Sequence, residues 1–181
     1  MKNSKKFLVV NGLLSLWLGS SYSYAQSPGV ALTAGSGSDA DIYGVALISH
    51  EGFWSYKSEN SVWRLVGHLE TSVSNIDGRL SGANEGIVVG GITPVFRFDH
   101  PNSPGYVEAG VGITYFSEKK IHNSKYVGTH FEFGDIFGFG LRFGQVKQHE
   151  IGYRVVHYSN AGISKNNPGI DFHQVRLRIG F

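Results

Sequence analysis

Apolar residues recur at every second position in several segments of the chain. Between Tyr106 and Phe116, the residues of one parity are Val, Ala, Ile and Tyr, whereas Glu, Gly and Thr fill most of the other parity. An alternation with a period of two is typical of a β-strand that has two different faces. The same alternation is found over residues 62–74, 131–143 and 174–181. It predicts an all-β fold.

The two faces of these segments differ in a way that favours a membrane barrel over a soluble sandwich. The apolar faces are rich in aromatic residues, and Asp135 is the exception on the apolar face of residues 131–143. The opposite faces mix Arg and Glu with Gly. In an outer-membrane barrel, apolar residues face lipid, while Gly, Arg and Glu fill a narrow, ion-paired lumen. His68, beside Arg64 and Glu70 on such a face, is predicted to join this network.

We therefore predict an eight-stranded antiparallel transmembrane β-barrel. Eight spans of about 9–11 residues with their turns account for residues 26–181 and leave no room for a second domain. If both ends of the barrel chain are periplasmic, the connection 160–169 is extracellular, at the edge of the outer leaflet. The predicted strands are 29–36, 41–50, 62–76, 85–98, 105–116, 130–144, 148–159 and 170–181.

Residues 1–25 have the layout of a secretory signal peptide. Lys2, Lys5 and Lys6 precede a mostly apolar stretch over 7–18, and small residues end at Ala25, where cleavage is expected. The apolar stretch is too short for a membrane-spanning helix. Without these three lysines, the formal charge of +2 becomes −1, with 13 basic and 14 acidic residues in 26–181. The basic excess is therefore no indication of nucleic-acid binding.

The composition excludes several other classes of protein. The chain has no cysteine, which excludes a disulfide scaffold and a thiolate-ligated metal site. A mean hydropathy of −0.12 argues against a bundle of membrane helices. The histidines do not have a spacing typical of zinc sites, and the glycines follow strand parity rather than forming a phosphate-binding loop. We expect neither a metal nor an organic cofactor.

One segment near the end of the chain contains residues suited to nucleophilic catalysis. On a strand, His157 and Ser159 are at i and i+2, so both side chains leave the same face within hydrogen-bonding reach. This is the arrangement by which a base activates a serine nucleophile. Asp171 begins the next antiparallel strand, about 4.8 Å away. It could accept the other ring N–H of His157 and orient the imidazole.

Strand parity places these three residues on the outside of the barrel. Ile151 and Val155 share the face of His157 and Ser159, and Val175 shares the face of Asp171. Ionisable groups on a lipid-facing surface are costly and hard to explain as packing. An enzyme acting on an outer-leaflet lipid would carry them there. The alternative is that His-x-Ser is a common tripeptide and that polar residues at strand ends mark the membrane–water boundary.

The residues around this segment resemble the lipid A 3-O-deacylases of the Gram-negative outer membrane, the PagL family. The resemblance covers essentially all of residues 26–181 and is strongest in the block His-Tyr-Ser-Asn-Ala-Gly at 157–162. The stretches 94–96, 108–112 and 138–143 support it. Gly-alternating strands alone would fit many barrels, whereas the 157–162 block is specific.

The resemblance implies a serine esterase that hydrolyses the ester-linked 3-hydroxyacyl chain at position 3 of lipid A. It would make Ser159 the nucleophile and His157 the general base. The acidic member, usually Glu in the family, falls at Asp171, which is shorter by one methylene and therefore requires a closer approach to His157. The oxyanion-hole candidates are Asn160 and the backbone N–H of Ala161 or Gly162.

Two nearby residues receive weaker assignments. His173 lies on the same face as Asp171, two residues later, and is a candidate for an auxiliary role. Lys165, in the 160–169 connection, could meet a lipid A phosphate, but a solvated loop lysine is the preferred interpretation. The expected partners are lipid A, or lipopolysaccharide, and the outer membrane, with no nucleic acid. A homodimer is left open.

Two other functions remain open on the sequence. A small non-enzymatic barrel, serving as an adhesin or a structural protein, would not need Ser159. An outer-membrane phospholipase or acyltransferase could use the same serine. Hydrolysis and transfer share the acyl-enzyme intermediate, so only the family resemblance favours hydrolysis.

Overall fold

The structure is a computed structural model that describes residues 27–50, 54–58, 61–164 and 168–181. The predicted signal peptide lies outside these residues. The described residues include no helix that is long and apolar enough to cross a membrane. Eleven strands are described: β1 (Gly29–Ser36), β2 (Ala40–Ile48), β3 (Trp54–Lys57), β4 (Arg64–Gly78), β5 (Ile87–Asp99), β6 (Gly105–Phe116), β7 (Lys120–His122), β8 (Lys125–Tyr126), β9 (Phe131–Phe143), β10 (His149–Ser159) and β11 (Ile170–Gly180).

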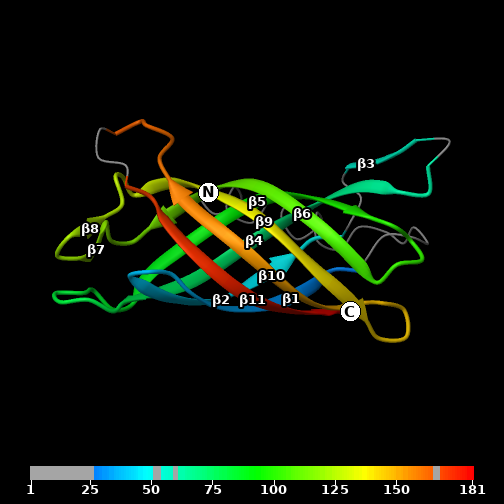
Figure 1. The fold of residues 1–181 in the computed structure, drawn as a ribbon, viewed down its shortest axis with the longest axis horizontal. Coiled ribbons are helices and arrows are strands. Elements are labelled where there is room, and N and C mark those ends of the chain that lie inside the picture. Colours follow the sequence, from blue (N-terminus) through cyan, green and yellow to red (C-terminus); the bar gives the residue numbers. More distant parts are fainter. Residues whose placement is uncertain (1–26, 51–53, 59–60, 165–167) are drawn as a thin grey trace, which may run out of the picture.

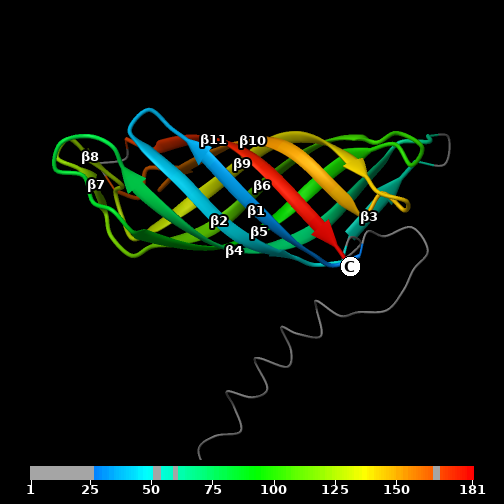
Figure 2. The same cartoon turned by 90° about the horizontal axis from the view of Figure 1, so that it is seen from below.

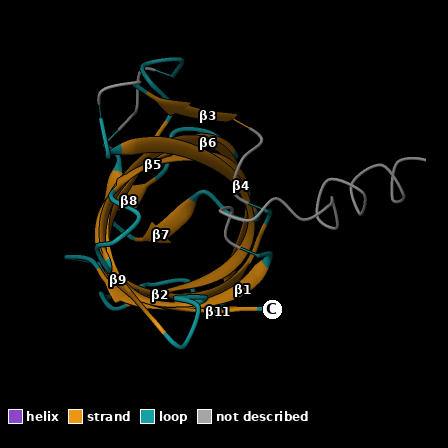
Figure 3. Cartoon of the chain, turned by 90° about the vertical axis from the view of Figure 1, so that its right-hand side faces the viewer, coloured by secondary structure: helices purple, strands orange, loops and turns teal. Residues whose placement is uncertain are grey.

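Eight of these strands form a closed antiparallel barrel (Figure 1). The order around the wall is β1, β11, β10, β9, β6, β5, β4 and β2, and the pairing of β2 with β1 closes the ring. The end view in Figure 3 shows the ring, and Figure 2 shows the steep tilt of the strands. Closure leaves none of the eight strands with an unpaired edge. The predicted eight-stranded barrel is confirmed.

The strand expected over 41–50 ends earlier, at Ile48. The N–H of Leu69 donates to Ser49 Oγ at 2.8 Å instead of to a backbone carbonyl, so the side chain of Ser49 interrupts the ladder.

Three short strands, β3, β7 and β8, were not predicted. β3 pairs with the first residues of β4. β7 and β8 form a hairpin in the long connection between β6 and β9.

The outer face of the barrel carries the predicted apolar band. The exposed large side chains come from alternate positions of every barrel strand, as expected for a wall that faces lipid. They include Leu32, Val45, Val73, Ile92, Ile113, Phe139, Ile151 and Leu177.

The middle of the lumen holds a buried network of ion pairs. Arg97 reaches Glu108 at 2.8 Å and Glu150 at 2.7 Å. Arg154 reaches Glu108 at 2.6 Å and also pairs with Glu70 at 2.7 Å. Small residues make room for these groups, since a Cβ on Gly138 would lie 2.7 Å from Arg154 Cγ. The predicted ion-paired lumen is therefore present.

The network also links the strands of opposite walls. Glu70 on β4 accepts hydrogen bonds from Arg176 on β11 at 2.8 Å and from His68 at 3.0 Å. Arg64, expected beside His68 and Glu70, pairs instead with Asp99 at 2.6 Å, because its cross-strand partner on β5 is Asp99. Each carboxylate is thus held by groups from several strands, which fixes β10 and β11 relative to the rest of the wall.

The lumen becomes apolar toward the end at which β10 is joined to β11, which we call the His157 end. Buried aliphatic and aromatic side chains from six barrel strands and from the β7–β8 hairpin meet there. In Figure 3, β7 lies within the outline of the ring, consistent with the complete burial of Ile121. The cluster contains Ala40, Ile42, Ile76, Ile87, Val89, Phe116, Ile121, Val127, Val156, Tyr158, Ile170 and Phe172. We call this cluster the apolar plug, and it fills the lumen at the His157 end.

Candidate active site

The outer face of β10 and β11 brings His157 and Asp171 together. The two residues are direct cross-strand partners in an unbroken ladder. His157 Nδ1 lies 2.6 Å from Asp171 Oδ1. The side chains are 42% and 65% exposed, respectively, so the pair is on the surface and not in the lumen. The shorter Asp side chain reaches the imidazole without any irregularity in the pairing of the two strands.

Ser159 is the last residue of β10 and shares the outer face with His157. The neighbours of opposite parity, Val156 and Tyr158, are buried in the apolar plug, which fixes the direction of the side chains between them. No hydrogen bond joins the side chains of Ser159 and His157 in the part of the chain that the structure describes. Hydrogen bonds between catalytic groups are often long before substrate binds.

The residues after Ser159 form a tight turn organised by Asn160. Its side chain is fully buried, and its Oδ1 accepts hydrogen bonds from the N–H of Gly162 at 3.1 Å and of Ser164 at 3.4 Å. Ala161 and Gly162 both have a left-handed backbone, with φ of 51° and 81°. Alanine rarely adopts this conformation. The turn therefore holds Ala161, two residues after Ser159, in a costly conformation.

Gly169 packs against the imidazole of His157 from the other end of the same connection. Its φ is +59°, and a Cβ placed on it would lie 2.6 Å from His157 Cε1 and 3.2 Å from Nε2. Only glycine allows both the backbone conformation and this close approach. The sequence prediction missed Gly169. The pair Pro168-Gly169 was the available signal, because such pairs mark turns.

Two polar groups on the outer wall lie next to the predicted residues. Asp135 on β9 is the cross-strand partner of His157 on the side opposite to Asp171. Tyr153 Oη lies 2.5 Å from His173 Nδ1. His173 is thus bonded to Tyr153 and not to the His157–Asp171 pair. From the sequence, Asp135 was only an exception on an apolar face. Its position beside His157 could not be predicted, because alternation within one strand does not give the register between two strands.

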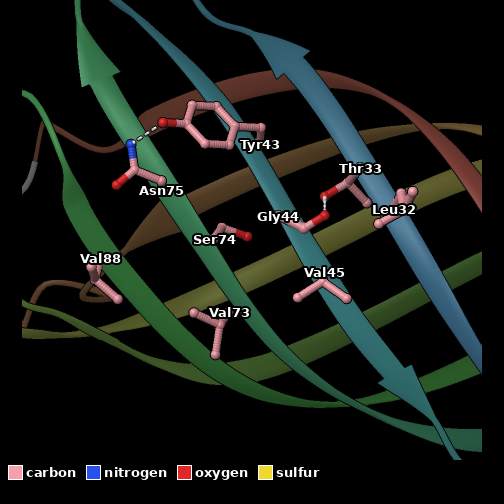
Figure 4. Close-up of a pocket in the computed structure, with 9 residues that line it drawn as sticks. All are labelled: Leu32, Thr33, Tyr43, Gly44, Val45, Val73, Ser74, Asn75 and Val88. Carbon is pink, nitrogen blue, oxygen red and sulfur yellow. Dashed lines mark hydrogen bonds between the residues drawn. The ribbon is translucent and has the colours of Figure 1, made fainter.

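A shallow apolar hollow is found elsewhere on the outer wall. It lies across β1, β2, β4 and β5. Asn75 donates to Tyr43 Oη at 2.8 Å, and Figure 4 draws this hydrogen bond at one side of the hollow. Its lining contains Ser74 but no imidazole and no carboxylate that could activate a hydroxyl. The lining residues are Leu32, Thr33, Tyr43, Gly44, Val45, Val73, Ser74, Asn75 and Val88. The hollow is therefore an apolar surface. The imidazole of His157 and the carboxylate of Asp171 lie outside it, at the His157 end.

The described residues hold no cluster of three or more His, Asp or Glu side chains arranged to bind a metal ion. Lys165, the candidate for contact with a lipid phosphate, lies outside the described residues. The described site offers a hydroxyl, an imidazole and a carboxylate, from Ser159, His157 and Asp171. That set is sufficient for acyl transfer through a covalent intermediate.

Comparison with known proteins gives matches over nearly the whole chain. A family model described as "Lipid A 3-O-deacylase (PagL)" matches residues 43–179. The chain is 33% identical over 187 residues to a lipid A deacylase PagL of Bordetella bronchiseptica, covering 100% of both chains. It is 26% identical over 179 residues to a lipid A deacylase PagL of Pseudomonas aeruginosa, covering 99% of both chains.

A solved structure has the same fold. It is titled as the crystal structure of the outer membrane enzyme PagL, and it matches with a TM-score of 0.74 and 24% identity. The match covers 84% of this chain and 99% of the other. The agreement extends over the complete barrel of the related structure.

Proposed function

This chain belongs to the lipid A 3-O-deacylase (PagL) family of outer-membrane enzymes, and we propose that it removes an acyl chain from lipid A as a serine esterase. Ser159 is the nucleophile, His157 the general base and Asp171 the acidic residue that orients His157. The observation that carries the proposal is the 2.6 Å contact between His157 Nδ1 and Asp171 Oδ1 on the outer wall. His157 is two residues before Ser159 on the same face of β10.

The first half of the reaction forms an acyl-enzyme. His157 Nε2 takes the proton of Ser159 as Oγ forms a bond to the ester carbonyl carbon. Asp171 stabilises the imidazolium and keeps the ring in the tautomer whose Nε2 can accept a proton. The bond between the carbonyl carbon and the sugar oxygen then breaks, and that oxygen receives the proton from His157. The sugar alcohol leaves.

The second half releases the fatty acid. A water molecule gives a proton to His157 and its oxygen bonds to the acyl carbon; the bond to Ser159 Oγ then breaks, and Ser159 regains a proton from His157. Hydrolysis requires this water to reach the acyl-enzyme. The exposure of His157 and Asp171 at the end of the barrel supports such access.

The turn after Ser159 supplies the donors for the oxyanion. Among the three candidates, the N–H of Gly162 already donates to Asn160 Oδ1, and the buried Asn160 side chain holds the turn. We assign the oxyanion contact first to the N–H of Ala161, whose left-handed backbone sets its direction. Asn160 then acts by holding that turn. A donor fixed before reaction stabilises the developing charge without reorganisation.

The site lies where an outer-leaflet lipid would present its ester. The apolar band extends down β10 and β11 from the His157–Asp171 pair and includes Ile151, Val175 and Leu177. We place the His157 end at the outer leaflet, with the acyl chain along this band and the sugar beyond the strand ends. Gly29 and Gly180, near the two ends of the barrel chain, pair at the opposite end. With both chain ends periplasmic, the His157 end faces outward.

The test is mass spectrometry of lipid A from Gram-negative cells that express the wild-type chain, Ser159→Ala or Ser36→Ala. Ser36 is an exposed serine at the same end of the barrel, on β1. We expect one 3-hydroxyacyl mass to be lost with the wild type and Ser36→Ala but retained with Ser159→Ala. Deacylation by a folded Ser159→Ala barrel would refute the serine mechanism. Appearance of the chain on an acceptor lipid would indicate transfer instead of hydrolysis.

A further inference from the structure

The hollow across β1, β2, β4 and β5 exists because the outward positions around Val73 carry small side chains. Val73 pairs with Val45 on β2 and with Gly90 on β5. Gly90 has the parity of the exposed Val88, and a Cβ placed on it would have open space around it. Figure 4 shows Val45, Val73 and Val88 around the hollow. Its surface is hydrocarbon and opens toward lipid, so an acyl chain can lie in it.

Three polar side chains, Tyr43, Asn75 and Asp77, border this hollow, and we call them the polar rim. Asn75 Nδ2 donates to Tyr43 Oη and to Asp77 Oδ1, both at 2.8 Å. Tyr43 Oη donates to Asp77 Oδ2 at 3.2 Å, and the N–H of Gly86 donates to Asp77 Oδ1 at 2.7 Å. The carboxylate of Asp77 only accepts, so it holds the Asn75 amide with its nitrogen toward Asp77 and its oxygen away.

The polar rim lacks a donor. Its own donor hydrogens, two from Asn75 and one from Tyr43, are all used within the rim. Asn75 Oδ1 accepts no hydrogen bond from any residue that the structure describes. A carbonyl oxygen beside a hydrocarbon surface is costly unless a donor reaches it. The group that fits the rim is therefore a hydrogen-bond donor carried by the molecule that fills the hollow.

The polar rim lies at the same end of the barrel as the candidate active site. Asp77 pairs with Asp41, and Asp41 pairs with Ser36. Ser36 pairs with His173, which is two residues after Asp171. With the His157 end at the outer leaflet, the rim is at the level where a lipid of that leaflet joins its chains to its head group, and the hollow is in the hydrocarbon below it.

The charges beside the polar rim disfavour a phosphate. Asp41 and Asp77 are direct cross-strand partners, so two carboxylates lie side by side. Arg79 lies 3.4 Å from Asp41 Oδ1 and offsets one of these charges. A phosphate would be repelled by the remaining negative charge, whereas sugar hydroxyls can donate to both carboxylates. The surroundings of the rim therefore suit a sugar head group.

We propose that the hollow binds the amide-linked acyl chain of a glycolipid, with the amide N–H donating to Asn75 Oδ1. The chain fills the hollow, and the sugar lies beside Asp77 and Asp41. The ester linkages of a phospholipid offer acceptors and no donor, so they leave the rim unsatisfied. This inference goes beyond the proposed function, because it assigns a second lipid site on another part of the wall, separate from Ser159 and His157.

The test is photo-crosslinking of the purified barrel in vesicles of phosphatidylethanolamine. The probe is an N-acylglucosamine with a diazirine in the middle of its acyl chain, and mass spectrometry identifies the labelled residues. We expect the labels to concentrate on the residues that line the hollow. The same lipid with a methylated amide nitrogen has no N–H, and it should label the hollow about 3- to 10-fold less, the range for one lost hydrogen bond.

Three variants locate the contact. Asn75→Leu removes the acceptor, so it should lower labelling by the amide probe to the level of the N-methyl probe. Thr71→Leu is the matched control, because Thr71 has the same parity on β4 but lies outside the hollow. Gly90→Leu should lower labelling by both probes, since its side chain would enter the hollow while the rim stays intact. All three changes face lipid, so gel mobility before and after heating should show folded barrels.

Several results would overturn the assignment. These are an unlabelled hollow, labels spread evenly over the outer wall, equal labelling by the two probes, or wild-type labelling of Asn75→Leu. A phosphatidylglycerol probe with the same diazirine chain separates the lipid classes. If it labels the hollow as strongly as the amide probe does, the hollow belongs to the ordinary lipid shell and the inference is wrong. The assay measures binding alone, so its failure leaves the esterase proposal standing, and a failed esterase leaves this inference standing.

Discussion

Replacing Gly169 with alanine tests whether the position of His157 in this structure is the working one. The new Cβ would lie 2.6 Å from His157 Cε1, whereas ordinary contact begins at 3.4 Å, so the imidazole or the connection must move by about 0.8 Å. A displacement of about 1 Å at a catalytic group costs on the order of 10²-fold in rate. The left-handed φ of +59° adds about 1–2 kcal/mol of backbone cost for alanine.

The assay measures initial rates of acyl release from lipid A in micelles, together with the unfolding temperature of the barrel. Gly86→Ala is the matched control, because Gly86 has a φ of +72° at the same end of the barrel and its added Cβ would meet only Asn75 Oδ1, at 3.9 Å. It carries the backbone cost without the displacement. We expect Gly169→Ala to lose about 10²-fold in rate and Gly86→Ala to lose less than about 3-fold. Equal rates for the two variants would show that the imidazole of His157 does not react from the position it has in this structure.

Three further predictions concern the acidic residue and the lumen. Asp171→Asn should lower the rate by about 10²- to 10⁴-fold without unfolding the barrel, because Asp171 is exposed and, in the proposed mechanism, orients His157. A folded variant with the wild-type rate would exclude this role. Glu150→Gln should lower the free energy of unfolding by about 3–5 kcal/mol, measured by denaturant titration in detergent, since it leaves buried arginine charge uncompensated; a loss below about 1 kcal/mol would contradict this. Gly140→Ala should impair folding, because the new Cβ would clash with Tyr106 Oη. Gly90→Ala is the control, since its Cβ would enter open space and the barrel should fold normally. Gel mobility before and after heating measures the folded fraction of each variant.

The alternation of the sequence determined most of the barrel. Glu108 and Arg154 have opposite parity to the apolar residues beside them, so both had to face the lumen once the outside was lipid. The same rule assigned His157, Ser159 and Asp171 to the outer wall, because side-chain direction in a strand depends only on position along that strand. The strand ends were less well defined. Ser49 ended β2 through a side-chain hydrogen bond that alternation does not encode.

The tertiary structure alone decided which groups meet across strands. Asp171 could be paired with His157 from sequence because a short connection joins their strands, whereas Asp135 comes from β9 and its position beside His157 depends on the register of a different pair. The contact of Gly169 with the imidazole likewise depends on the path of a connection and not on a period. Local periodicity thus fixed which way each side chain points. Register and loop path, which are set by packing across the whole wall, fixed its neighbours.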